Sequence, residues 1–203
     1  MSSSVSPARR SSRWVILALA LSFILPFVFG HLAYERGWFG GGVTNKGELI
    51  TPPLAVRDLA LSDAGGAAAD LSGRWWIVYV VPDVCDAACQ QSWQALPSMH
   101  AGLGRERGRV GVLLVTSADS APVPEVLRRL PAVRQVSAER SLLAARLGSA
   151  GVPAPAIGRW FIMDPMGWIM LTYLPPPASD AAILKAQDVL DDLQKLLKVS
   201  RIG

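Results

Sequence analysis

The chain has 203 residues, 51% hydrophobic and 18% charged, which is too apolar for a disordered chain and enough for one medium-sized domain with a hydrophobic core. Its net charge is +4, but three of the 20 basic residues, Arg9, Arg10 and Arg13, precede the first apolar run, which no acidic residue precedes. The rest of the chain carries 17 Lys and Arg against 16 Asp and Glu, so it lacks the basic stripe of a nucleic-acid-binding protein, and we expect no nucleic-acid partner.

The first predicted element is a membrane-spanning helix at residues 14–30, after a short N-terminus at residues 1–13. Its sequence, WVILALALSFILPFVFG, contains no charge and is just long enough to cross a bilayer of about 30 Å. The preceding arginines favour a cytoplasmic N-terminus, which predicts a single-pass inner-membrane protein with its domain in the periplasm. A cleaved signal peptide is the alternative. The bulky Phe27 and Phe29, and an apolar run longer than the usual 7 to about 15 residues, favour an uncleaved anchor.

Residues 31–69 predict a tether followed by irregular or hairpin structure, because Gly and Pro interrupt short apolar pieces. Six apolar residues of this segment are expected to contact the edge of the main core: Leu49, Ile50, Leu54, Val56, Leu59 and Leu61. The globular domain is predicted to span residues 70–203.

This domain begins with GRWWIVYVVP at residues 73–82, a run of aromatic and β-branched residues that predicts a buried central strand. A helix with good formers follows, although Pro97 is expected to kink or interrupt it. A second buried strand is predicted at residues 109–118, and the segments that follow it predict two short helices (122–130, 138–148), a hairpin turning at DPMG (158–173) and a C-terminal amphipathic helix (183–197). Five charged residues are assigned to the outer face of that last helix: Asp188, Asp191, Asp192, Lys195 and Lys198.

The order of these elements predicts the fold class. Strand, helix and strand require a parallel crossover, and the closing hairpin adds antiparallel strands. We therefore expect an α/β domain with a mixed, thioredoxin-like sheet flanked by helices on both faces, preceded by one transmembrane helix.

The cysteines of the chain, Cys85 and Cys89, lie between the first core strand and its helix. A thiol at a helix N-terminus ionises more easily, and residues four apart share one helix face, so a disulfide is within reach after modest adjustment. Two thiolates at this spacing can also hold one Cu(I). A disulfide that merely pins the loop is the third interpretation, but so short a ring removes little entropy from the unfolded chain. In an exported domain, where disulfides persist, the position favours redox or copper chemistry.

A copper site normally needs a third ligand, and the sequence offers few. His31 lies at the membrane edge, and His100 lies roughly 16 Å from Cys89 along a continuous helix. Three methionines, Met163, Met166 and Met170, carry thioethers, but Met on strands is more often core filler. The tryptophans near the motif, Trp75, Trp76, Trp93 and Trp160, either border a partner groove or fill the core, and the core is the commoner place.

The segments LSGRWWIVYVVPDVCDAAC and GRWFIMDPMG resemble the SCO/SenC family of membrane-anchored, thioredoxin-like proteins over residues 71–173. The resemblance implies a role in cytochrome c oxidase assembly, by delivering copper to the binuclear copper site of subunit II or by reducing its cysteines. It matches Cys85 and Cys89 to the two thiol ligands. The family's histidine, nine positions before the proline of DPMG, corresponds to Ala156, so this chain resembles a divergent branch without the third ligand.

A thioredoxin-like fold often places a cis-proline beside the active cysteines, and Pro153 or Pro155 is the candidate. We expect Cys85 to be the attacking thiolate and Cys89 to resolve the mixed disulfide, with Asp83 and Asp86 nearby raising the thiol pKa. The predicted function is thiol–disulfide exchange at the subunit II copper site, with no required cofactor. The alternatives are a non-enzymatic copper chaperone or oxidase scaffold with weak Cu(I) binding, and an inert anchored domain with a structural disulfide.

Overall fold

The computed structural model describes residues 12–36, 45–174 and 181–200, and the compact unit of the chain begins at Asn45. Arg9 and Arg10, used above to predict orientation, lie outside the described residues, as does the side chain of Ile183. In chain order the elements are α1 (Ser12–Glu35), β1 (Glu48–Ala55), η1 (Val56–Leu59), β2 (Trp75–Val80), α2 (Ala87–Gly102), η2 (Gly104–Arg109), β3 (Val110–Thr116), α3 (Glu125–Arg128), β4 (Val133–Ser137), α4 (Arg140–Ser149), β5 (Trp160–Met163), β6 (Trp168–Tyr173) and α5 (Ala181–Val199).

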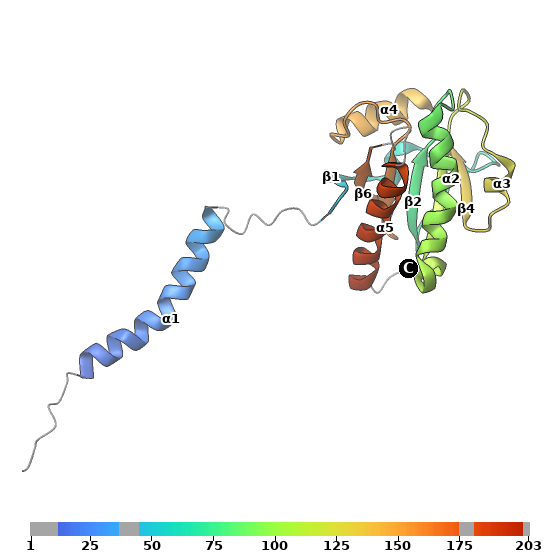
Figure 1. The fold of residues 1–203 in the computed structure, drawn as a ribbon. Coiled ribbons are helices and arrows are strands. Elements are labelled where there is room, and N and C mark those ends of the chain that lie inside the picture. Colours follow the sequence, from blue (N-terminus) through green and yellow to red (C-terminus); the bar gives the residue numbers. More distant parts are fainter. Residues whose placement is uncertain (1–11, 37–44, 175–180, 201–203) are drawn as a thin grey trace, which may run out of the picture. The chain divides into compact units, whose positions relative to one another are not determined.

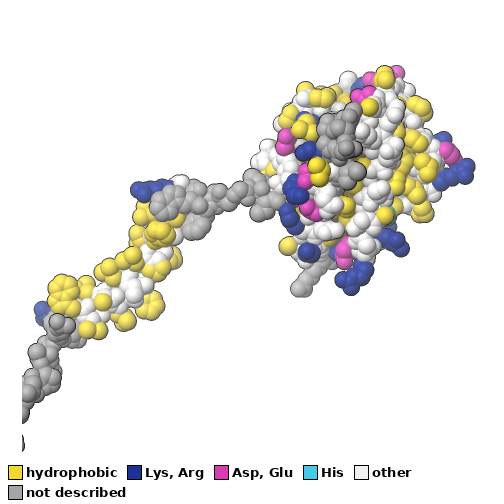
Figure 2. Space-filling view, in the orientation of Figure 1, with side chains coloured by type: hydrophobic (Ala, Val, Ile, Leu, Met, Phe, Trp, Pro, Cys, Tyr) yellow, Lys and Arg dark blue, Asp and Glu magenta, His cyan; other side chains and the backbone are white. Residues whose placement is uncertain are grey.

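Helix α1 contains the predicted anchor and extends beyond it at both ends. By length and composition it is able to cross a membrane, and its large hydrophobic side chains are exposed, with Trp14 at 75% and Phe27 at 84%. Hydrophobic side chains run along this helix in Figure 2. A helix that is apolar on all sides and leaves its large hydrophobic side chains uncovered by protein is typical of a membrane span.

The domain is built on one six-stranded sheet in the order β1-β6-β5-β2-β3-β4 (Figure 1). The pairs β2–β3 and β3–β4 are parallel, and the pairs β1–β6, β6–β5 and β5–β2 are antiparallel. The mixed thioredoxin-like sheet expected from the element order is therefore confirmed.

Strand β2 separates two hydrophobic clusters because its side chains alternate between the faces of the sheet. Trp75, Ile77 and Tyr79 belong to the cluster that α2 and α5 cover, which we call the α2 cluster. Trp76, Val78 and Val80 belong to the cluster that α4 and η1 cover, which we call the α4 cluster. The helices α2 and α5 lie side by side on their face in Figure 1. Helices on both faces are thus confirmed.

The structure differs from the sequence prediction at the edges of the sheet. The segment predicted as irregular or hairpin contains β1, which pairs with β6, and residues 133–137 form the edge strand β4, which was not predicted. Ile50, Leu54, Leu59 and Leu61 are buried as expected, but Leu49 is 57% exposed, because successive residues of a strand face opposite sides.

Two helix predictions also change. Pro97 does not interrupt α2, which runs through it to Gly102. Asp192, assigned to the outer face of α5, is 1% exposed. Its carboxylate accepts hydrogen bonds from the Lys46 and Gly47 N–H groups, at 2.7 and 2.9 Å, and from the Tyr173 hydroxyl at 3.0 Å. This acceptor therefore ties the beginning of β1 to α5.

Candidate functional site

The two cysteines lie where the sequence places them, and they form a disulfide with their Cα atoms 5.0 Å apart. Cys85 immediately precedes Asp86, the N-cap of α2, and Cys89 lies in the first turn of that helix. Cys89 is buried, with 1% exposed, whereas Cys85 is half-buried. A partner thiol approaching from solvent therefore meets the sulfur of Cys85 first.

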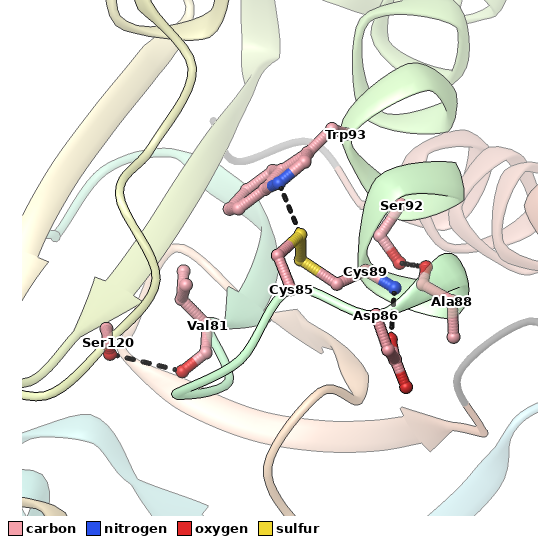
Figure 3. The surroundings of a disulfide bond; sticks show 8 residues. All are labelled: Val81, Cys85, Asp86, Ala88, Cys89, Ser92, Trp93 and Ser120. Atoms are coloured by element: carbon pink, nitrogen blue, oxygen red, sulfur yellow. Dashed lines mark hydrogen bonds between the residues drawn. A yellow bond between two sulfur atoms is a disulfide. The ribbon is translucent and has the colours of Figure 1, made fainter.

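Asp86 satisfies the start of helix α2. Its carboxylate accepts a hydrogen bond from the Cys89 N–H at 2.9 Å (Figure 3), and its backbone carbonyl accepts from the Gln90 N–H at 3.0 Å. Asp, Asn and Ser are preferred at an N-cap because their oxygens take up these otherwise unpaired donors. The Cys89 N–H therefore binds the Asp86 carboxylate and does not donate to a cysteine sulfur.

Asp83, the other predicted flanking carboxylate, is paired. The guanidinium of Arg140, at the start of α4, forms a salt bridge with Asp83 and donates to Ser117 Oγ at 2.7 Å. Ser120 Oγ in turn donates to the Val81 carbonyl at 3.2 Å (Figure 3). Arg140 therefore offsets part of the negative charge beside the cysteines and joins their loop to the loop after β3. The sequence prediction weighed only the carboxylates and missed this arginine, which lies far along the chain.

The proline loop lies at the same end of the sheet. The Ala154–Pro155 peptide bond is cis, so of the two candidates Pro155 has the cis bond. Gly158 N–H donates to the Val80 carbonyl at 2.8 Å, which joins this loop to the end of β2 from which the cysteine loop leaves.

Arg159 holds the proline loop from inside. It is 1% exposed, and its Nε donates to the Pro155 carbonyl at 2.8 Å, while Nη1 lies 3.6 Å from a Glu48 carboxylate oxygen. Arg159 was not predicted as a site residue, because an arginine immediately before a strand is usually exposed to solvent.

Of the third-ligand candidates, Met170 packs against the α2 cluster, which contains Cys89, whereas His100, Met163 and Met166 lie elsewhere. His100 lies in the last turn of α2, with Nε2 at 2.9 Å from the Val110 carbonyl, and Met163 is buried in the α4 cluster on the other face of the sheet. Met166 is 72% exposed on the β5–β6 turn, and Ala156 packs against the α4 cluster. Among residues 12–36, 45–174 and 181–200, no three His, Cys, Asp or Glu side chains are grouped to hold a metal.

The tryptophans are core residues, as the commoner interpretation expected, with Trp160 at 0%, Trp75 at 4%, Trp76 at 5% and Trp93 at 9% exposed. Trp93 has a second contact that the sequence prediction missed. Its indole N–H donates to the sulfur of Cys85, with 2.9 Å between Nε1 and Sγ (Figure 3). Cys85 and Trp93 lie eight residues apart in the sequence, close to two turns of a helix, and this spacing could have predicted the contact.

The fold and the site define a thioredoxin-like protein with a cysteine pair at the start of the helix after its central strand, in a chain that also carries a helix able to span a membrane. More particularly, the chain belongs to the family described as "Transmembrane-like, thioredoxin-like, C-terminal domain", whose model matches residues 75–200. A comparison with curated protein sequences finds no match.

Solved structures of Sco proteins are similar to this domain. Yeast Sco1 with copper bound is 17% identical, over 78% of this chain and 96% of that chain, with a TM-score of 0.50. Arabidopsis thaliana ScoI with copper bound is 14% identical, over 70% and 97%, with a TM-score of 0.48. BsSco, described as having a disulfide switch and as a member of the Sco family of cytochrome c oxidase assembly proteins, is 11% identical, over 73% and 96%, with a TM-score of 0.48. The resemblance to SCO proteins is thus confirmed at the level of the fold.

Proposed function

We propose that this protein is a membrane-anchored thiol–disulfide exchange protein that acts in the periplasm on the cysteines of the copper site of cytochrome c oxidase subunit II. The observation that carries the proposal is the Cys85–Cys89 disulfide, with one half-buried and one buried sulfur at the start of α2. The subunit II partner comes from the resemblance to the SCO/SenC family.

The two cysteines are sufficient for a complete thiol–disulfide exchange reaction. In the reduced protein the Cys85 thiolate attacks a sulfur of the partner disulfide, and the second partner sulfur leaves as a thiolate that takes a proton. The Cys89 thiolate then attacks Cys85 Sγ, which reforms the protein disulfide and releases the first partner sulfur. Two electrons and two protons pass from the protein dithiol to the partner disulfide.

The test is reduction of an oxidised subunit II copper-site peptide by the reduced full chain in detergent. We expect Cys85→Ser to abolish reduction and Cys89→Ser to accumulate a mixed disulfide with the peptide, because the resolving sulfur is missing. His100→Ala is the matched control and is expected to react normally, since His100 lies at the far end of α2. Normal reduction by Cys85→Ser would overturn the proposal.

A copper chaperone is the second candidate function, because two reduced sulfurs four residues apart can hold one Cu(I). Ala156 supplies no third donor, so we expect weak Cu(I) binding. A Cu(I) titration of the reduced full chain, together with the midpoint potential of the pair, separates the two functions. Tight stoichiometric Cu(I) favours the chaperone, whereas weak Cu(I) with a midpoint potential in the exchanging range favours the exchange protein.

A further inference from the structure

The side chain of Trp93 contacts the sulfur of Cys85, and this contact gives Trp93 a role at the site besides packing in the core. Its indole N–H is a donor only, and it points at Cys85 Sγ from one turn beyond Cys89 (Figure 3). Trp93 is 9% exposed, so water does not compete freely for this donor. The acceptor is the sulfur that solvent reaches first.

The indole is held in place by the central strand. The rings of Trp93 and Tyr79 meet edge to face, with centroids 5.3 Å apart and planes at 78°. Tyr79 is 1% exposed, and its hydroxyl interacts with Ser92, whose own hydroxyl donates to the Ala88 carbonyl at 3.0 Å. Packing and hydrogen bonds therefore fix the direction of the indole N–H before any reaction.

The charged groups beside the cysteines do not themselves donate to the Cys85 sulfur in the contacts that the structure describes. Asp86 is a carboxylate next to Cys85 and already occupies the Cys89 N–H, and Asp83 is paired with Arg140. Tyr79 is neutral at physiological pH, because burial raises its pKa to about 12. Of these groups the carboxylates oppose a thiolate and Arg140 offsets one of them, while the Trp93 N–H points at the sulfur itself.

We propose that Trp93 stabilises the Cys85 thiolate of the reduced protein by this hydrogen bond, and thereby makes Cys85 the attacking sulfur. The inference rests on the exchange reaction proposed above, for which it names a further participating residue. A sulfur in a disulfide is a weak acceptor and a thiolate is a strong one, so the bond strengthens when the disulfide is reduced. It therefore lowers the thiol pKa of Cys85 and raises the midpoint potential of the pair, because the reduced form is the one stabilised.

The test uses Trp93→Phe, which keeps an aromatic ring and removes the N–H. In a full-length chain in which Cys89→Ser leaves Cys85 as the one thiol, we expect Trp93→Phe to raise the pKa of Cys85 by about 1 to 2, the effect of one hydrogen bond to a charged group. Alkylation at neutral pH is expected to slow roughly 3- to 10-fold, since the higher intrinsic nucleophilicity recovers half of the loss on a logarithmic scale. With both cysteines present, the same substitution is expected to lower the midpoint potential.

Trp160→Phe is the matched control. Trp160 is fully buried in the same α2 cluster, and its indole nitrogen has no hydrogen-bond partner in the part of the chain that the structure describes. We expect this substitution to leave the thiol pKa unchanged. An equal rise of the pKa in both variants, or no rise in Trp93→Phe, would overturn the role of the indole.

A measurement that keeps Trp93 covers the case in which Trp93→Phe does not fold. In the Cys89→Ser chain, where Cys85 is the one thiol, the NMR resonance of the Trp93 indole proton is expected to move downfield with the same apparent pKa as the ultraviolet absorbance of the Cys85 thiolate. An indole resonance that ignores this ionisation would contradict the inference. None of these measurements needs the oxidase peptide, so a failure of the subunit II assignment and a failure of the Trp93 inference give different results.

Discussion

At the scale of single residues, Asp192 is the side chain for which we expect the largest effect on stability. Asp192→Ala leaves the buried Gly47 N–H and Tyr173 hydroxyl without their acceptor. Loss of a buried charged acceptor is expected to lower the free energy of unfolding by roughly 3 to 5 kcal/mol. Urea denaturation of the oxidised protein measures the change.

Asp191→Ala is the control for Asp192, one residue away on the same helix. Asp191 pairs with the half-exposed Lys46 ammonium at 2.7 Å, in contact with water that screens the pair. We expect this substitution to leave the free energy of unfolding nearly unchanged. Equal losses in the two variants would contradict the burial argument.

Tyr79 predicts an alkaline loss of stability. Burial raises its pKa to about 12 in the folded protein, whereas the unfolded chain ionises at the ordinary value of 10.0. Between these values the folded state holds the proton that the unfolded state has lost, so the free energy of unfolding falls as pH rises. The contribution of Tyr79 is expected to reach about 3 kcal/mol near pH 12, and Tyr173, whose pKa burial also raises, adds to the fall. Urea denaturation at a series of pH values measures it, and Tyr79→Phe should reduce the slope while Tyr173 maintains the remainder; an unchanged slope in that variant would assign the whole effect to another group.

At the scale of elements, the start of α2 separates two effects of Asp86. Asp86→Ala removes the N-cap and is expected to cost about 1 kcal/mol, whereas Asp86→Ser keeps a capping oxygen and is expected to cost little. Both remove a negative charge beside Cys85 and should therefore lower its thiol pKa. Urea denaturation and the pH dependence of alkylation measure the two effects independently. A higher thiol pKa in Asp86→Ser would show that the carboxylate does not oppose the thiolate.

The strands that could be predicted from the sequence are more deeply buried than the strands that could not. Strands β2 and β3 are buried along their whole length, so their apolar runs identify them from sequence. Strand β4 is an edge strand with a single fully buried residue, Val136, and its polar Arg134 and Gln135 hide any periodicity. Strand β1 contains Pro52 and Pro53, where its pairing with β6 is irregular. Proline cannot donate to a sheet ladder, so such a segment is not recognised as a strand from its sequence.

The same distinction applies to the site. The position of the cysteines before a helix could be predicted because the strand, loop and helix are adjacent in the chain. The contacts of Arg140 with Asp83 and of Arg159 with the Pro155 carbonyl depend on tertiary packing, which no local pattern records.

At the scale of the whole molecule, β1 begins at the end of the sheet that holds the cysteine pair. Glu48 pairs with Thr172, Thr172 with Phe161, and Phe161 with Val78, two residues before the end of β2. Because β1 is antiparallel to β6 and β6 runs in the same direction as β2, the chain enters the domain at the end from which the cysteine loop leaves.

The contribution of β1 to the domain predicts where the folding unit begins. A chain starting at Asn45 retains β1 and η1, and we expect it to fold and to leave the membrane fraction, because it lacks α1. A chain starting at Leu71 begins one residue after Asp70, the boundary predicted from sequence, and close to the start of the family match at residue 75. It loses four buried residues of the α4 cluster: Ile50, Leu54, Leu59 and Leu61.

Burial of each of these side chains contributes roughly 1.5 to 3 kcal/mol, so their combined loss is comparable to a typical domain stability of about 5 to 15 kcal/mol. The shorter chain also removes the Lys46 and Gly47 N–H donors of Asp192. We therefore expect the chain starting at Leu71 to lack a cooperative unfolding transition, which near-ultraviolet circular dichroism during urea denaturation detects. If both chains unfold at the same urea concentration, β1 is an appendage, and the domain begins where the sequence alone placed it.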